Sequence, residues 1–196
     1  KFGVSNLIHF NSPVRHLKVL TEKQSNINQS WPKIKLEWTD DGDEETKSDV
    51  FDAVCVCNGH YAAPFCPKIP GMEYFKGQQM HSIEYDDPSI FRGKTVLCVG
   101  GRASGADLAR EISLHSDKVY LADTTCPELE EGKPIQEGNV AWVPRFNSVN
   151  EDGTLSFAGG CIEKPEVDII VFCSGYDYQF PFINNKSNLD LSVVKG

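Results

Sequence analysis

One segment constrains the fold of this 196-residue sequence more than any other: a short apolar strand that ends in a glycine-rich turn and leads into a helix. Thr95–Val99 is a compact apolar run, and Gly100–Gly105 is the turn that follows it. Leu108 and Ile112 are four residues apart, so a helix places both on one face. Lys118–Ala122 then has the pattern of a second strand. The segment predicts a βαβ unit, as in dinucleotide-binding α/β folds.

The expected function of the turn is to hold a pyrophosphate. A helix N-terminus presents unpaired backbone N–H groups and the positive end of the helix dipole, and both favour an anion. The dinucleotide-binding pattern has glycine at its first, third and sixth positions, and Arg102 replaces the third. A plain tight turn is the alternative, but the flanking strand and helix favour dinucleotide binding. We therefore predict six cofactor-binding residues: Gly100, Gly101, Arg102, Ala103, Ser104 and Gly105.

Two residues bear on the choice of nucleotide, and they point in different directions. Asp123 closes the second strand 23 residues after Gly100, near the spacing at which a carboxylate binds the adenosine ribose of NAD. Arg102 could instead pair with the 2′-phosphate of NADP through its guanidinium. A third interpretation is that Asp123 caps a turn and Arg102 is solvated. The sequence leaves these alternatives open.

A repeated pattern occurs at two distant places in the chain. Phe51–Cys57 and Val167–Cys173 each contain an aspartate followed by five apolar residues. After each run come a small polar residue, a glycine and an aromatic ring. Near-continuous apolar runs are typical of strands covered on both faces, and a terminal glycine permits a sharp turn or a close ligand. We therefore predict two buried strands whose ends share a role.

The rest of the chain has simpler patterns. Lys33–Trp38 alternates polar and apolar residues and predicts a half-buried strand, followed by an acidic, solvent-exposed turn over residues 40–45. Three prolines in Ala62–Gly71 predict an extended linker. Trp142–Phe157, with Asp152–Gly153 at its centre, predicts a β-hairpin or a strand pair.

The charge balance argues against a nucleic-acid partner. The sequence has 19 Lys and Arg against 28 Asp and Glu, a net charge of −9, and it contains no basic cluster. A phosphate backbone requires clustered Lys and Arg, so no nucleic-acid partner is expected. No apolar run approaches the ~20 residues that span a bilayer. We expect cytoplasmic localisation, with membrane association of a longer parent protein left open.

The seven cysteines predict free thiols. Cys55, Cys98 and Cys173 lie in apolar runs, where a buried cysteine behaves as a small hydrophobic residue. An odd number placed in this way favours reduced thiols over a disulfide framework. Cys55 and Cys57 are too close for the usual zinc-binding spacing, and the sequence has no second pair, so no metal site is expected.

Four motifs, in order along essentially the whole chain, resemble those of the flavin-containing monooxygenase family. Val56–Tyr61 looks like a strand-end motif of its glucosinolate S-oxygenase-like branch, and Phe75–Tyr85 fits the family pattern F-x-G-x-x-x-H-x-x-x-[YF]. The glycine turn follows, and Phe172–Tyr176 resembles the family's FATGY-like motif. The same branch often lacks the glycine that Arg102 replaces. At Thr124 the family more often has an arginine that helps to hold the NADPH phosphate, so this sequence departs from the family there.

The resemblance implies an α/β fold in which a Rossmann-like NADP-binding domain is inserted into part of an FAD-binding domain, as in two-dinucleotide-binding flavoproteins. Residues 1–62 are then a partial FAD-binding domain, residues 63–165 the NADP-binding domain, and residues 166–196 the return to the FAD-binding domain. His81 is expected to order the linker between the domains, with a purely structural role as the alternative. Four residues are expected to face the join between the two cofactors: Asn58, Gly59, Gly175 and Tyr176.

The reaction implied by the resemblance is the oxygenation of a soft nucleophilic sulfur or nitrogen. NADPH reduces FAD, the reduced flavin takes up O2 as a C4a-hydroperoxide, and the substrate attacks the distal oxygen. The cofactor supplies this chemistry and the protein supplies position and water exclusion, so no catalytic side chain is assigned. The expected cofactors are FAD and NADP, with NAD as the alternative. The expected partners are a small sulfur- or nitrogen-containing substrate, O2 and the remaining FAD-domain segments of a parent protein.

Two other interpretations stay open. The family's first glycine motif, which binds the FAD pyrophosphate, belongs before Lys1, so we expect this chain alone to be inactive. That expectation favours a non-catalytic NAD(P)-binding fragment. A pyridine-nucleotide disulfide oxidoreductase would share the two-domain plan, but it needs a redox-active cysteine pair. Cys55 and Cys57 lie in a run predicted to be buried, where a thiolate is disfavoured.

Overall fold

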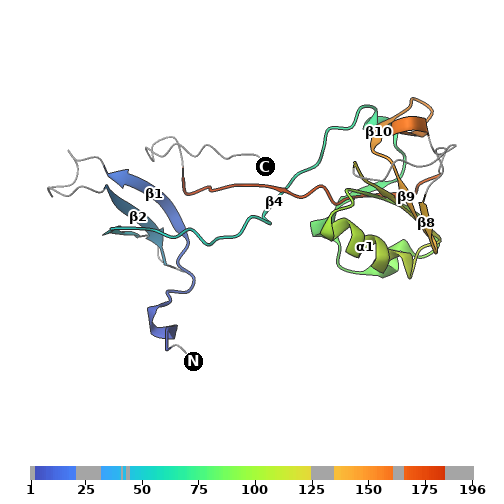
Figure 1. Ribbon diagram of the computed structural model, residues 1–196. Coiled ribbons are helices and arrows are strands. Elements are labelled where there is room, and N and C mark those ends of the chain that lie inside the picture. The colour runs from blue at the N-terminus through green and yellow to red at the C-terminus, as the bar shows by residue number, and fades with distance from the viewer. Residues whose placement is uncertain are drawn as a thin grey trace. The chain divides into compact units, whose positions relative to one another are not determined.

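The chain divides into two compact units, and each is described by itself. The computed structural model describes residues 3–20, 32–40, 42, 45–124, 135–160 and 166–183. One unit comprises Lys1–His60 and Tyr178–Gly196, and the other comprises Tyr61–Asp177 (Figure 1). Among the described residues, no helix has both the length and the apolar character to cross a membrane.

The unit Tyr61–Asp177 is built on a six-stranded sheet with one α-helix described beside it. Five strands are parallel, and the edge strand β8 is antiparallel to β9. In spatial order the strands are β5 (Gln78–His81), β12 (Ile169–Phe172), β6 (Thr95–Val99), β7 (Lys118–Ala122), β9 (Val140–Val143) and β8 (Ile135–Glu137). The helix α1 (Ala103–Ser113) connects β6 to β7, so the predicted βαβ unit is confirmed.

The central strand β6 lies where the strand order reverses. The chain proceeds from β6 to β7 on one side, and it returns much later to form β12 on the other side. In open α/β sheets, ligands bind outside the carboxyl ends of the strands at such a switch point. The topology therefore places the glycine-rich turn at the edge where a ligand is expected.

Both faces of this sheet are covered, which explains the near-continuous apolar strands. Successive strand residues point to opposite faces. Val96 and Cys98 pack with Ile112 of α1 in a helix-side cluster, and Leu97 packs with Phe157 in a hairpin-side cluster. The hairpin consists of β10 (Phe146–Val149) and β11 (Leu155–Phe157), which confirms the predicted hairpin. Figure 1 shows α1 and β10 on opposite sides of the strands.

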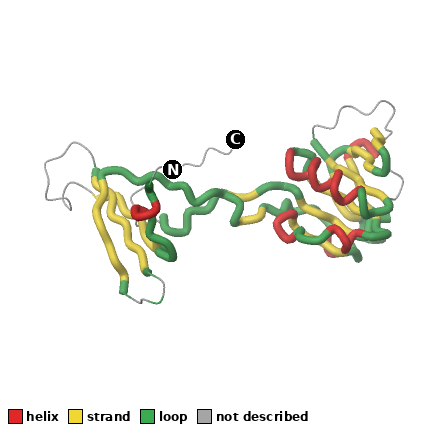
Figure 2. The backbone as a smooth tube through the Cα atoms, turned by 90° about the horizontal axis from the view of Figure 1, so that it is seen from below, coloured by secondary structure: helices red, strands yellow, loops and turns green. Residues whose placement is uncertain are grey.

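Short elements complete this unit. They are the 3-10 helices η2 (Met72–Tyr74), η3 (Ser82–Glu84), η4 (Pro88–Phe91) and η6 (Ala158–Gly160), and the two-residue strands β4 (Ala63–Pro64) and β13 (Tyr176–Asp177). β4 and β13 pair antiparallel, so the chain enters and leaves the unit along one short ladder. Figure 2 shows the strands and helices from a second direction. The proline-rich stretch after β4 has no regular structure up to η2, as predicted for a linker.

The first unit is an antiparallel meander of β1 (Val14–Leu20), β2 (Lys33–Thr39) and β3 (Thr46–Phe51), preceded by η1 (Ser5–Leu7). β2 confirms the predicted half-buried strand, since every residue in it is partly exposed. Residues 41, 43 and 44 of the predicted acidic turn lie outside the described residues. Gly42 is exposed and has φ +78°.

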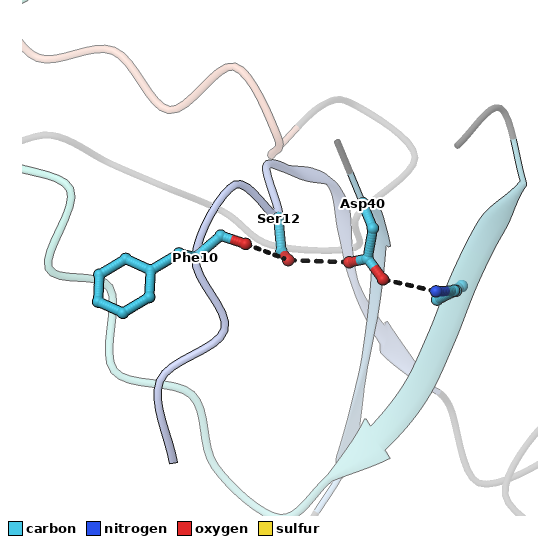
Figure 3. A network of polar contacts seen from close by, with 4 residues as sticks. Phe10, Ser12 and Asp40 are labelled. Atoms are coloured by element: carbon cyan, nitrogen blue, oxygen red, sulfur yellow. Dashed lines mark hydrogen bonds and ion pairs between the residues drawn. The ribbon is translucent and has the colours of Figure 1, made fainter. Parts of the chain in front are cut away.

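A polar network lies beside the ends of these strands (Figure 3). The Ser12 hydroxyl is 2.8 Å from a carboxylate oxygen of Asp40 and 3.0 Å from the Phe10 carbonyl oxygen. The other oxygen of Asp40 accepts a hydrogen bond from the Lys47 ammonium. The Lys47 ammonium, and after it the Ser12 hydroxyl, lowers the pKa of the Asp40 carboxyl. The network therefore joins the start of β1, the end of β2 and β3.

The prediction that Phe51–Cys57 is a buried strand is wrong. β3 ends at Phe51, the following residues form no strand, and Cys55 and Cys57 are exposed. Such a run becomes a buried strand only where other strands pair with it and layers cover both faces. The similar run near Cys173 has β5 and β6 as neighbours, whereas no described strand pairs with residues 53–57. Buried thiols are therefore confirmed at Cys98 and Cys173 but not at Cys55.

The packing unit Tyr61–Asp177 is a division by contacts, and it includes β12. The expected return segment begins at residue 166, but β12 lies inside the six-stranded sheet. By packing, the unit continues to Asp177. The assignment of the units to FAD and NADP stays a prediction.

Candidate functional site

A cavity of about 540 Å³ opens at the carboxyl ends of the three central strands. Its walls come from the turn after β6 (Gly100–Ser104), from Asp123 and Thr124 after β7, and from Cys173–Tyr176 at the end of β12. Arg145, which precedes β10, lines the same space. The volume lies within the ~300–1,000 Å³ that small-molecule and cofactor sites occupy. The cavity therefore lies at the switch point of the sheet.

Three glycines of the turn lie so close to neighbouring atoms that no side chain would fit at their positions. Gly100 has φ +108°, and a Cβ there would lie 2.7 Å from the Cys173 carbonyl oxygen. A Cβ on Gly105 would lie 1.7 Å from the Gly100 carbonyl oxygen. A Cβ on Gly101 would lie 2.3 Å from a carboxylate oxygen of Asp123. The backbone of the turn thus packs directly against the backbone of its neighbours at Gly100 and Gly105, and against the Asp123 carboxylate at Gly101.

The start of α1 offers unpaired donors to the cavity. Arg102 occupies the N-cap position without a side-chain cap hydrogen bond, and its carbonyl accepts the N–H of Ala106 at 3.0 Å. The first N–H groups of a helix have no acceptor within it, and the helix dipole adds positive potential. Arg102, Ala103 and Ser104 are exposed. The arrangement can hold an anionic group such as a diphosphate.

A buried histidine fixes the segment that follows β12. The Nε2 of His81 lies 3.0 Å from the Gly175 carbonyl oxygen, and its Nδ1 accepts the Ile83 N–H at 3.2 Å. Nε2 therefore carries the ring hydrogen and donates a hydrogen bond to the Gly175 carbonyl oxygen. His81 also lies edge-on to Tyr176, with ring centroids 5.1 Å apart, and Gly175 has φ +83°. His81 thus holds the turn that forms one wall of the cavity, which agrees with the structural role considered for it.

The Cys98 thiol, behind the turn, is not activated as a nucleophile. Cys98 is fully buried, and its contact with the Cys173 thiol, followed by burial, raises the pKa of Cys98 well above its ordinary value. The sulfur atoms of Cys55 and Cys57 lie 3.5 Å apart, and the hydrogen bond between the two thiols, followed by charge repulsion between them, raises the pKa of Cys57. A redox-active pair needs an accessible thiol with a lowered pKa. Cys57 is accessible but lacks that property, so the described thiols do not favour a disulfide oxidoreductase.

The cavity brings together most of the residues that the sequence predicted. Eight of them line it: Gly100, Gly101, Arg102, Ala103, Ser104, Asp123, Gly175 and Tyr176. Gly105 is buried behind the turn, where its lack of a side chain lets α1 approach. Asn58 and Gly59 belong to the other unit, and Gly59 has φ +69° there.

Sequence reasoning missed several lining residues. Arg145 and Phe146 stand just after β9, the next parallel strand beyond β7, and Tyr61 comes from the entry segment. No local motif marks these positions. The available signal was the order of the parallel strands, because the end of each neighbouring strand reaches the same edge of the sheet.

A parallel sheet with a glycine turn at its switch point and a cavity at its carboxyl edge defines an α/β unit of the dinucleotide-binding class. The FMO-like family, described as "Flavin-binding monooxygenase-like", matches residues 2–129, more than half of the 196 residues. The chain therefore belongs to the flavin-containing monooxygenase family, whose members are oxidoreductases, and the family implies FAD as a cofactor. The resemblance inferred from the sequence motifs is confirmed.

Individual relatives agree with this assignment. Flavin-containing monooxygenase FMO GS-OX5 of Arabidopsis thaliana is 39% identical over 139 residues, which cover 71% of this chain and 30% of the relative. FMO GS-OX-like 3 of the same plant is 33% identical over 184 residues, which cover 94% of this chain and 39% of the relative. The structure of S-allyl-L-cysteine S-oxygenase from Allium sativum matches with a TM-score of 0.76 at 31% identity, covering 93% of this chain and 39% of that one. The chain thus spans about a third of the length of these relatives.

Proposed function

We propose that this chain is the nicotinamide-nucleotide-binding part of an FAD-dependent monooxygenase that uses O2 to oxygenate a soft sulfur or nitrogen centre of a small molecule. The observation that supports this most directly is the glycine turn that exposes the start of α1 to the cavity at the switch point. The turn also follows Phe75–Tyr85, the motif that in this family precedes the second dinucleotide motif.

The order of the strands suggests how the nucleotide would lie. The ends of β7, β6 and β12 stand side by side, and they present Asp123, the turn and Gly175 in that order. A carboxylate after the second strand binds the adenosine ribose, and the first turn binds the diphosphate. The nicotinamide would then extend toward Gly175 and Tyr176. These residues bind and orient the nucleotide, which supplies the hydride for the flavin when bound.

FAD would be held by other segments of a longer protein. Among the described residues α1 is the one α-helix, so its N-terminus can serve one diphosphate. The sulfur substrate is supported by the similarity to S-allyl-L-cysteine S-oxygenase from Allium sativum. We therefore expect the isolated chain to bind a nicotinamide nucleotide without oxygenating a substrate.

The test is calorimetric titration of the isolated chain with NADPH and NADH in the absence of FAD. The variant Ser104→Glu adds a negative charge at an exposed position of the first turn of α1, where the dipole favours an acidic side chain. It should fold normally and bind either nucleotide at least about tenfold more weakly, because its carboxylate repels the diphosphate. The control Arg110→Gln changes the net charge equally, on an exposed face of α1 away from this cavity, and should bind like the parent chain.

Two outcomes would contradict the proposal. The parent chain binding neither nucleotide would remove the assigned function. Equal binding by the parent chain and Ser104→Glu would show that the nucleotide lies elsewhere.

A further inference from the structure

We infer that Asp123 makes this cavity select NADH over NADPH, an inference that rests on the proposed function. Asp123 lines the cavity and is only 9% exposed. Its carboxylate lies directly against the turn, where a Cβ on Gly101 would come within 2.3 Å of Oδ2 and 2.7 Å of Cγ. A carboxylate therefore stands beside the place assigned to the diphosphate.

The backbone holds this carboxylate in position from both neighbouring strands. The N–H of Asp123 donates to the Val143 carbonyl at the end of β9, at 3.1 Å. The N–H of Gly100 donates to the Ala122 carbonyl, one residue before Asp123, at 2.8 Å. Because the side chain is short and buried, it has little freedom to turn away from a bound nucleotide.

A fixed carboxylate discriminates between the two nucleotides by its chemistry. Its two oxygens accept hydrogen bonds, and the free 2′- and 3′-hydroxyls of the adenosine ribose of NADH can donate them. A phosphate monoester at the 2′ position of NADPH removes one donor and brings about 1.5 to 2 negative charges. Placing that charge beside Asp123 is repulsive, and partial burial of the pair reduces screening by water and salt.

The cations of the cavity do not reverse this preference. Arg102 is exposed at the N-cap of α1, so a pairing of its guanidinium with the 2′-phosphate would be screened by solvent. Arg145 is exposed and precedes β10. An exposed guanidinium on a long side chain gains less from pairing than the buried carboxylate loses from repulsion. Thr124, which follows Asp123, is uncharged.

The test compares four probes on the 196-residue chain: NADH, NADPH, ADP-ribose and 2′-phospho-ADP-ribose. The last two lack the nicotinamide, so they isolate recognition of the ribose. Each unphosphorylated probe should bind at least about tenfold more tightly than its phosphorylated counterpart. Asp123→Asn keeps the shape that packs against Gly101 and removes the charge. This variant should lower the ratio of the affinity for each unphosphorylated probe to that for its phosphorylated counterpart about tenfold or more, chiefly because the phosphorylated probes bind more tightly.

Matched variants separate the possible outcomes. Asp107→Asn removes the same charge from an exposed position of α1 and should leave the ratio unchanged. A parent chain that prefers the phosphorylated probes would overturn the inference, and loss of that preference in Arg102→Gln or Arg145→Gln would identify the guanidinium that recognises the 2′-phosphate. A ratio that Asp123→Asn leaves unchanged would also overturn it. If Asp123→Asn does not fold, the parent chain alone tests the inference, which a parent chain without a preference for the unphosphorylated probes would overturn. Binding of none of the four probes would instead refute the proposed function.

Discussion

Gly105 lies where α1 packs against the turn after β6. For its replacement by alanine, helix propensity and packing predict changes in stability of opposite sign. Propensity alone predicts stabilisation of about 1 kcal/mol, because glycine is unfavourable inside a helix. The structure predicts a clash, since the new Cβ would lie 1.7 Å from the Gly100 carbonyl oxygen and 2.8 Å from its carbon. Both are backbone atoms that cannot rotate away, so α1 would have to move off the sheet.

The magnitude follows from these two contributions. Overpacking a close contact costs about 1–3 kcal/mol, and a backbone contact this short belongs at the upper end. Subtracting the propensity gain of about 1 kcal/mol leaves a net destabilisation of about 2 kcal/mol. The sign of the change therefore separates packing from propensity.

Native-state hydrogen exchange is the appropriate assay, because the chain has two units and a single unfolding transition cannot be assumed. Amides of β6 and α1 should exchange faster in Gly105→Ala by the factor that corresponds to about 2 kcal/mol, roughly thirtyfold. Asp107→Ala, at an exposed position of the same helix, should change protection by less than about 0.5 kcal/mol. Protection in Gly105→Ala equal to or above that of the parent chain would refute the packing described for the turn.

Two further predictions concern stability. Burial, and after it the Glu111 carboxylate, raises the pKa of Tyr85 to about 12. The unfolded state, whose tyrosine has a pKa near 10, releases its proton first, so stability from this group should fall as pH rises from about 10 to about 12. Tyr85→Phe should flatten that part of a pH series of urea denaturation followed through the NMR signals of the unit Tyr61–Asp177; an unchanged slope would contradict the assignment. Phe157→Ala, in the hairpin-side cluster, should lower the unfolding free energy of its unit by about 3–5 kcal/mol. Leu114→Ala, at a side chain of the same unit that is 78% exposed, should change stability by less than about 0.5 kcal/mol; equal losses in the same denaturation measurement would show that burial is not the cause.

Local patterns predicted the parts of the fold that depend on near neighbours in sequence. The strand at Thr95–Val99, the turn and the amphipathic helix were predicted because periodicity and glycine placement are properties of a short segment. The hairpin around Asp152–Gly153 was predicted for the same reason, and the structure pairs Phe146 with Phe157 across it. The substitution at Arg102 is compatible with the turn because that side chain is exposed at the N-cap.

Two similar runs show the limit of this reasoning. Residues 52–57 and 168–173 have nearly the same pattern, yet only the second forms a buried strand. A run of apolar residues shows that a strand can be buried but not whether partners exist to bury it. The partners of β12 are β5 and β6, which lie about 90 and 70 residues earlier in the chain. Their pairing is a long-range property that no local pattern contains.

The sequence by itself determined the glycine-rich turn, the βαβ unit and the family, because each depends on residue types at fixed short spacings. Only the tertiary structure decided that the Asp123 carboxylate lies against Gly101, that Arg145 enters the same cavity, and that His81 holds Gly175. These contacts join residues 22 to 94 positions apart, and the order of strands in the sheet brings them together. The physical reason is that main-chain pairing and side-chain burial select neighbours in space, whereas spacing in sequence records only neighbours along the chain.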